Sequence, residues 1–242
     1  HRPVCGPGDP RAYTARTVFV TVLAETTVGQ VASEHPIATR VFARHQIDFC
    51  CGGGRPIADI CAAMGLDTAA ILQEINVELS TADSDVDQWN EAPLPDLIEH
   101  IVRTYHRSLD EELPRLEFMA RKVLRVHGDK APDILPALVS TLLGLRTELE
   151  EHMAKEENIL FPMILAGKGR SALGPISVME EEHESASASL SQLRELTDDY
   201  RVPEGACNTW GALWHGLAAL EKDLHQHIHL ENNILFPRSQ MS

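Results

Sequence analysis

The chain has 242 residues, of which 43% are hydrophobic and only 5% aromatic, so it can hold one large domain or an ordinary domain plus a small one. Its net charge of −15 disfavours the phosphates of nucleic acids as partners. No apolar run is long enough to cross a membrane, and five cysteines without a CxxC spacing indicate a reduced, cytoplasmic protein.

The N-terminal third divides into a tail, a small unit and a linker. Residues 1–27 open with HRPVCGPGDPRAY, which has neither a starting Met nor an apolar segment, so we expect a leader or a disordered tail. Residues 28–80 predict a small helical unit that contains cysteines and is marginal in size by itself. The acidic and polar stretch at 81–93 predicts a linker.

Short helices are predicted within the small unit. The pattern of 28–47 indicates a helix that breaks near Pro36, and DFCCGGG (48–54) ends it because glycine favours turns over helices. Pro56 suits the first turn of the next helix, and Asp67 is a good N-cap for a third.

The remaining chain, 94–242, predicts long amphipathic helices. Breaks rich in Gly and Pro separate four segments with helical periodicity, at about 94–127, 133–166, 175–198 and 206–236. Four such helices with short connections predict an all-α fold, an up-down-up-down four-helix bundle preceded by the small helical unit.

Polar residues interrupt the apolar faces of these helices in a repeated order. In the fourth helix, leucines spaced by three and four residues lead to His227 and Glu231. The second helix repeats this order with His152 and Glu156, and Ile159 is expected to continue its inward face. A histidine and a glutamate four residues apart lie one turn apart on one side of a helix, close enough to reach a common centre.

The other two long helices each add one inward histidine, His106 in the first and His183 in the third. A single inward histidine is more often a hydrogen-bonded core residue. Four of them with two glutamates in a duplicated context instead indicate metal ligands, because buried carboxylates are costly unless cations lie between them.

The donor set favours two metal ions. Six nitrogen and oxygen ligands without a thiolate exceed one tetrahedral zinc site, and two carboxylates that can bridge suggest a pair of ions. Imidazole and carboxylate together suit iron or manganese. With a bridging oxo or hydroxo group, about one coordination position per ion would stay open for a small molecule such as O₂ or NO.

Two further features have simpler interpretations. His225 and His229 are rotated away from His227 on the helix and are expected at the surface. The shared ending NILFP predicts packing at one end of the bundle, with Pro162 and Pro237 stopping their helices.

These motifs together resemble a known family. HMAKEENILFP (152–162) and HIHLENNILFP (227–237), with GPISVMEEEH (174–183) and VRTYH (102–106), resemble the hemerythrin-like bundle of the bacterial iron–sulfur cluster repair di-iron proteins. DFCCGG (48–53) resembles the small cysteine-containing domain that precedes the bundle in that family.

The resemblance implies a di-iron centre and a role in repairing iron–sulfur clusters damaged by nitric oxide or peroxide, by supplying iron. The implied partners are damaged or apo iron–sulfur proteins and the small ligands NO and O₂. Four histidines and two glutamates match the family's iron ligands and bridging carboxylates: His106, His152, Glu156, His183, His227 and Glu231.

Two questions stay open at this point. Cys50 and Cys51 are either a thiol pair that handles iron, sulfur or NO, or two small buried residues in a tight loop. The di-iron centre could donate iron, reduce NO or peroxide as an enzyme, or bind O₂ or NO as a sensor. The cysteine-containing unit favours iron donation.

Overall fold

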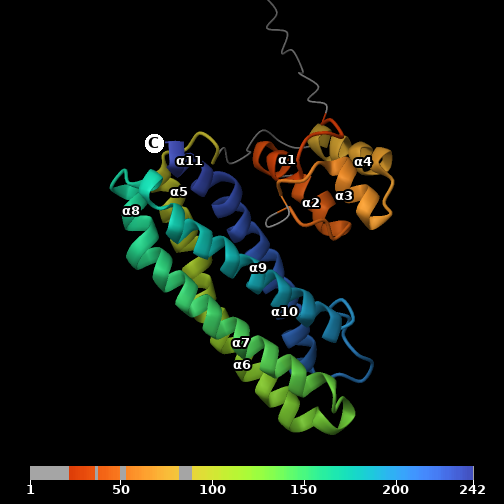
Figure 1. The fold of residues 1–242 in the computed structure, drawn as a ribbon. Coiled ribbons are helices and arrows are strands. Elements are labelled where there is room, and N and C mark those ends of the chain that lie inside the picture. The colour runs from red at the N-terminus through yellow and green to blue at the C-terminus, as the bar shows by residue number, and fades with distance from the viewer. Residues whose placement is uncertain (1–21, 36–37, 50–52, 82–88, 242) are drawn as a thin grey trace, which may run out of the picture.

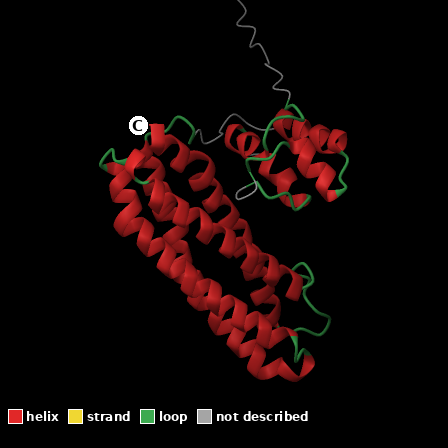
Figure 2. Cartoon of the chain, in the orientation of Figure 1, coloured by secondary structure: helices red, strands yellow, loops and turns green. Residues whose placement is uncertain are grey.

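A computed structural model describes residues 22–35, 38–49, 53–81 and 89–241, and helices dominate all of them (Figure 2). Figure 1 shows a small helical unit beside one end of a long four-helix bundle. The predicted all-α architecture is therefore confirmed. None of the helices in the described part of the chain combines the length and the apolar character needed to span a membrane.

The small unit has four short helices around its own core. Asp67 caps the last of them, as its Oδ1 accepts from the backbone N–H of Ala69 at 2.9 Å, and Gly65 ends the preceding helix in the left-handed conformation at φ 69°. Val22, before the first helix, is buried in the same core. The helices are α1 (Val28–Glu34), α2 (Thr39–Arg44), α3 (Ile57–Met64) and α4 (Thr68–Thr81).

Parts of the sequence predictions lie outside the described residues. These are residues 1–21 of the tail, Pro36 at the predicted helix break, Cys50, Cys51 and Gly52 of the glycine-rich loop, and residues 82–88 of the linker. The described neighbours of the two cysteines are Phe49 and Gly53, which belong to the loop between α2 and α3.

The bundle forms a closed ring in which α6 packs on α7, α7 on α9, α9 on α10 and α10 on α6. This order around the ring is the one that an up-down-up-down connection gives. The first long helix is built of α5 (Leu94–Ile101), η2 (Val102–His106) and α6 (Arg107–His127). The second comprises α7 (Ile134–Lys155), η4 (Glu156–Leu160) and α8 (Phe161–Leu165). The third is α9 (Leu173–Leu196), and the fourth comprises α10 (Asn208–Leu230), η6 (Glu231–Leu235) and α11 (Phe236–Met241).

Three of these long helices contain a π-helical turn, in which each hydrogen bond spans one extra residue. The extra residue rotates everything beyond the turn by about 100° relative to an uninterrupted α-helix. The prediction that Ile159 faces inward is therefore wrong. Ile159 is 53% exposed, and Leu160 takes the inward position with 1% exposure.

The expectation that Pro162 and Pro237 stop their helices is also wrong. Each proline is the second residue of a new α-helical segment after a π turn, and α8 and α11 continue to Leu165 and Met241. Proline is tolerated there because each π turn interrupts the regular i→i−4 hydrogen bonds of the helix just before it. The preceding phenylalanines and leucines do pack one end of the bundle, as NILFP predicts.

Gly216 on α10 tests how closely α6 and α10 approach, and Gly144 on α7 is the control. A Cβ on Gly216 would lie 2.6 Å from Cδ2 of Leu116, which is fully buried, whereas a Cβ on Gly144 would meet nothing within 4 Å. Gly144→Ala should therefore raise the free energy of unfolding by about 0.5–1 kcal/mol through helix propensity alone. Gly216→Ala should gain less or destabilise, because Leu116 must shift. Urea unfolding measures both, and equal stabilisation would contradict the close approach.

Candidate metal centre

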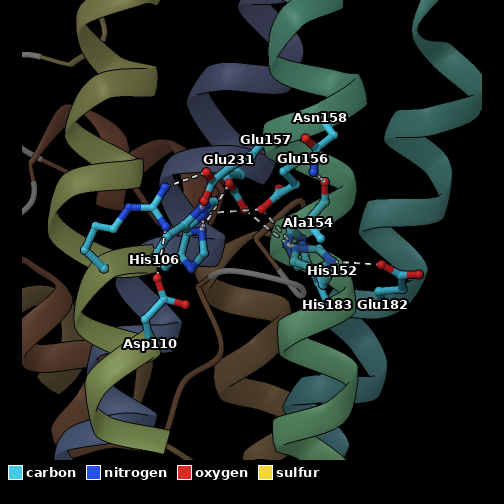
Figure 3. A network of polar contacts seen from close by, with 12 residues as sticks. His106, Asp110, His152, Ala154, Glu156, Glu157, Asn158, Glu182, His183 and Glu231 are labelled. Atoms are coloured by element: carbon cyan, nitrogen blue, oxygen red, sulfur yellow. Dashed lines mark hydrogen bonds and ion pairs between the residues drawn. The ribbon is translucent and has the colours of Figure 1, made fainter.

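The six predicted ligand residues meet in the interior of the bundle. Figure 3 labels five of them: His106, His152, Glu156, His183 and Glu231. All six are buried, with at most 3% of their surface exposed. Each of the four long helices contributes at least one, and the π turns carry three: His106 ends η2, Glu156 opens η4 and Glu231 opens η6. The structure therefore brings together every residue of the predicted set.

The six residues form two overlapping groups with the spacing of metal sites. His106 and His227 make one group with the two glutamates, and His152 and His183 make the other with the same glutamates. In each group, one candidate ligand atom per residue lies within 4.8 Å of all the others. Both carboxylates are thus shared between two neighbouring positions.

The imidazoles point their Nε2 atoms at one another. Nε2 of His106 lies 3.3 Å from Nε2 of His227, and Nε2 of His152 lies 3.0 Å from Nε2 of His183. Two such nitrogens at this distance compete for a single proton unless a cation lies between them. The Glu231 carboxylate is equally close to two imidazoles. Its Oε1 lies 3.1 Å from His227 Nε2, and its Oε2 lies 3.1 Å from His183 Nε2.

Neighbouring side chains hold the outer nitrogens of three imidazoles. An Nδ1–H that donates outward fixes the tautomer and leaves the Nε2 lone pair facing the cluster, which is the arrangement of metal-binding histidines. The pairs are His106 Nδ1 with Glu157 Oε1 at 2.9 Å, His152 Nδ1 with Glu182 Oε2 at 2.9 Å, and His183 Nδ1 with Asn232 Oδ1 at 2.8 Å.

The fourth imidazole is held differently. Nδ1 of His227 has no hydrogen-bond partner among the described residues, and its ring stacks on Tyr105 with centroids 5.3 Å apart. Burial of the ring between the helices and its stacking on Tyr105 fix its orientation without a hydrogen bond at Nδ1.

Sequence reasoning missed the three residues that orient the imidazoles. Glu157 and Asn232 occupy the same place in the two copies of the repeat, directly after the inward glutamate. Glu182 directly precedes His183. The repeat therefore contained a signal for two of them, but their partners are on other helices, and only the packing of the bundle shows those contacts.

The electrostatics of the cluster favour a cation. Burial alone would lower the pKa of His152, but the charges of Glu156 and Glu231 raise it to about 9. Burial would likewise raise the pKa of Glu231, but the positive charge of His227 and the nearby imidazole of His183 hold it well below its usual range. The field that favours charged imidazoles also favours a metal ion.

Carboxylate oxygens without hydrogen-bond partners also indicate that the cluster binds a cation. Both carboxylate oxygens of Glu156 and Oε2 of Glu231 are buried without a partner in hydrogen-bond geometry among the described residues. A buried carboxylate without compensation costs several kcal/mol. The residues present therefore fit a metal centre with nitrogen and oxygen donors, of the type that suits iron or manganese.

Two cavities reach this cluster from outside. One of about 250 Å³ opens between α7 and α9 and is lined in part by His152, His183 and His227. Another of about 220 Å³ between α6 and α10 is lined in part by Tyr105 and His227. Cavities thus border the cluster on two sides of the bundle.

The surface prediction is wrong for His229, whereas His225 is half-buried. His229 is only 3% exposed, and burial lowers its pKa to about 4. Its ring packs edge-on against Phe49 of the small unit, with centroids 5.4 Å apart, and His225 lies 6.2 Å from the same ring. The periodicity of one helix marked this face as outward, which is correct for the bundle alone, but the small unit covers it.

A buried ring of histidines and carboxylates within four antiparallel helices defines a hemerythrin-type, cation-binding bundle. The sequence profile described as "Hemerythrin HHE cation binding domain" matches residues 97–239. A second profile, described as a domain of unknown function (DUF542), matches residues 24–78.

Curated relatives narrow this class further. The iron-sulfur cluster repair protein YtfE of Yersinia pseudotuberculosis serotype O:1b is 45% identical over 212 residues, covering 88% of this chain and 95% of the relative. The protein of the same name from Yersinia pestis (strain Pestoides F) is 44% identical over the same coverage. The chain belongs to the family of these iron–sulfur cluster repair proteins.

Loss of an outer hydrogen bond should weaken cation binding without destroying the site. Asn232→Ala removes the acceptor that fixes the ring of His183, and affinity for iron should fall about 10–100-fold. Asn158→Ala is the control, since the exposed Asn158 bonds only the carbonyl of Ala154 in its own helix. Competition with a ferrous chelator measures both, and equal affinities would contradict the orienting role of Asn232.

Proposed function

We propose that this protein holds two iron ions and uses them to repair iron–sulfur clusters damaged by nitrosative or oxidative stress, by donating iron. The observation that carries the proposal is the pair of overlapping four-residue groups that share Glu156 and Glu231. A single-ion site would not need two shared carboxylates between two pairs of imidazoles. The names of the relatives support the repair role.

The side chains of the cluster have separate tasks in this proposal. Glu156 and Glu231 each offer two oxygens and neutralise positive charge in the buried interior. The four imidazoles supply nitrogen donors, three of them in tautomers that an outer hydrogen bond fixes. Bound iron would supply open coordination positions and redox activity. An oxo or hydroxo bridge between the two ions remains a prediction.

Iron donation requires that the protein can release its bound iron, and imidazole and carboxylate ligands allow such release. Imidazoles and carboxylates exchange protons for metal, so their hold on iron depends on pH and on competing ligands. Damaged or apo iron–sulfur proteins would be the recipients. A cytoplasmic location, where such clients are made, also remains a prediction.

The cavities favour a second candidate function. A route of about 250 Å³ to His152, His183 and His227 admits diatomic molecules to the proposed centre. The centre could then reduce NO or peroxide as an enzyme, or bind O₂ or NO as a sensor. These alternatives need the iron to stay in place, whereas donation needs it to leave.

Removal of either shared carboxylate should reduce the iron content. Glu156→Ala or Glu231→Ala should lower bound iron well below two ions per chain, because both groups lose a ligand at once. Glu111→Ala, at an exposed position of α6, should leave the iron content unchanged. Anaerobic reconstitution followed by iron quantification gives the numbers, and two ions per chain in both site variants would refute the shared site.

One experiment separates the candidate functions. The iron-loaded protein is incubated anaerobically with NO and an apo iron–sulfur acceptor, then separated from it, and iron is counted in both fractions. Transfer of iron to the acceptor supports donation. Consumption of NO with an added electron donor and full retention of iron would support the reductase, and bound NO without turnover or transfer would support the sensor.

The cysteines are proposed to take part in repair as a thiol pair. A Cys50→Ser/Cys51→Ser double variant should keep its iron, because six nitrogen and oxygen donors of the described residues already form the cluster, but should repair clusters more slowly than the parent protein. The same transfer assay measures the rate. A normal rate would end the thiol hypothesis and leave the interpretation of two small residues in a tight loop.

A further inference from the structure

The two copies of the repeat differ where the second one contacts the small unit. Aligned from His152 and His227, the third position is Ala154 in the first copy and His229 in the second. Ala154 is exposed, whereas His229 is buried under the small unit. The copies therefore differ in function on their outer faces, although their inner faces supply equivalent residues to one cluster.

The seventh position is asparagine in both copies but has different surroundings. The amide nitrogen of Asn158 donates to the carbonyl of Ala154 at 2.7 Å, at the solvent-exposed surface. The amide nitrogen of Asn233 lies 3.3 Å from the equivalent carbonyl, of His229, and also 3.1 Å from the Nδ1 atom of that residue. Its third partner is the carbonyl of Phe49 in the small unit, at 3.4 Å.

Glycines of the small unit are fitted closely around Asn233. A Cβ on Gly29 would lie 2.4 Å from Oδ1 of Asn233, and a Cβ on Gly53 would lie 2.7 Å from the same oxygen. The backbone N–H of Gly29 donates to the carbonyl of Gly53 at 2.8 Å, so α1 and the loop reach Asn233 together. Such an approach requires residues without side chains on both sides.

The contact joins the small unit to the turn that carries a cluster carboxylate. In η6, Glu231 faces the cluster, Asn232 holds the ring of His183, and Asn233 contacts the small unit. On the other side, Phe49 and Gly53 flank the three-residue segment that contains both cysteines. One helical turn thus contacts the metal cluster and both described ends of the cysteine loop.

We propose that Asn233 and His229 are positioning residues that dock the small unit on η6 through Phe49 and Gly53, so that the small unit and the candidate metal cluster act as one unit. This inference rests on the proposed function for its repair readout. The docking itself rests on contacts between described residues. The first copy, with Ala154 and Asn158 in solvent, has no such task.

Two bundle-side variants and a matched control test the docking. Asn233→Ala removes the bond to Phe49, and His229→Ala gives the second copy the residue that the first already has, so the helix can fold. Both should speed hydrogen exchange of the amides of Val28, Gly29 and Ile57 by about tenfold, because their bonds join α1 to the loop segment that Asn233 contacts. Asn158→Ala, which removes the same type of helical bond from the first copy, should leave exchange unchanged.

Iron content and repair rate complete the test. Iron per chain should stay at the parental value in all three variants, while iron transfer to an apo acceptor should slow at least about fivefold only in Asn233→Ala and His229→Ala. Unchanged exchange in both variants would overturn the docking role. Faster exchange with a parental transfer rate would overturn the coupling, and equal loss of iron in Asn158→Ala and Asn233→Ala would show a helix-stabilising role instead.

Failure of the two proposals is distinguishable. The exchange measurement needs no iron transfer, so a failed repair function would show as an inactive parent protein with normal docking. A failed docking role would show as exchange rates that do not respond to the substitutions.

Discussion

The burial of two carboxylates is the constraint on which the bundle depends. Glu156 and Glu231 have no exposed surface, and the cost of such burial is several kcal/mol unless positive charge compensates it. Four imidazoles surround them, and acceptors on neighbouring helices hold three of these rings. The interior of this bundle is therefore specified by charge compensation as much as by apolar packing.

The π turns allow a polar cluster to lie within an apolar core. One apolar core lies on the side of α6, α7 and most of α10, and a second lies beyond the cluster, where α5, α8 and α11 end the bundle. Each π turn rotates the helix by about one residue at the cluster. The row of inward apolar residues in one core therefore does not continue directly into the row of the other core. In the second helix Leu160 faces inward and Ile159 does not, whereas in the fourth helix both Ile234 and Leu235 are buried.

The residues of the duplicated segment have three structural roles. Its histidine and glutamate face the cluster, and the residue after the glutamate orients a histidine of another helix, as Glu157 does for His106 and Asn232 does for His183. Its outer face differs between the copies, since His229 packs beneath Phe49. A comparison of the copies thus separates what the cluster requires from what the small unit adds.

The sequence by itself determined the four long helices, the break in the first predicted helix, and the six inward polar residues, because helical periodicity depends on residues a few positions apart. Tertiary structure decided the rest. The π turns, the partners of the outer imidazole nitrogens and the burial of His229 depend on contacts between segments far apart in the chain. The periodicity of one helix records which of its faces is apolar, but it cannot record which neighbour covers the polar one.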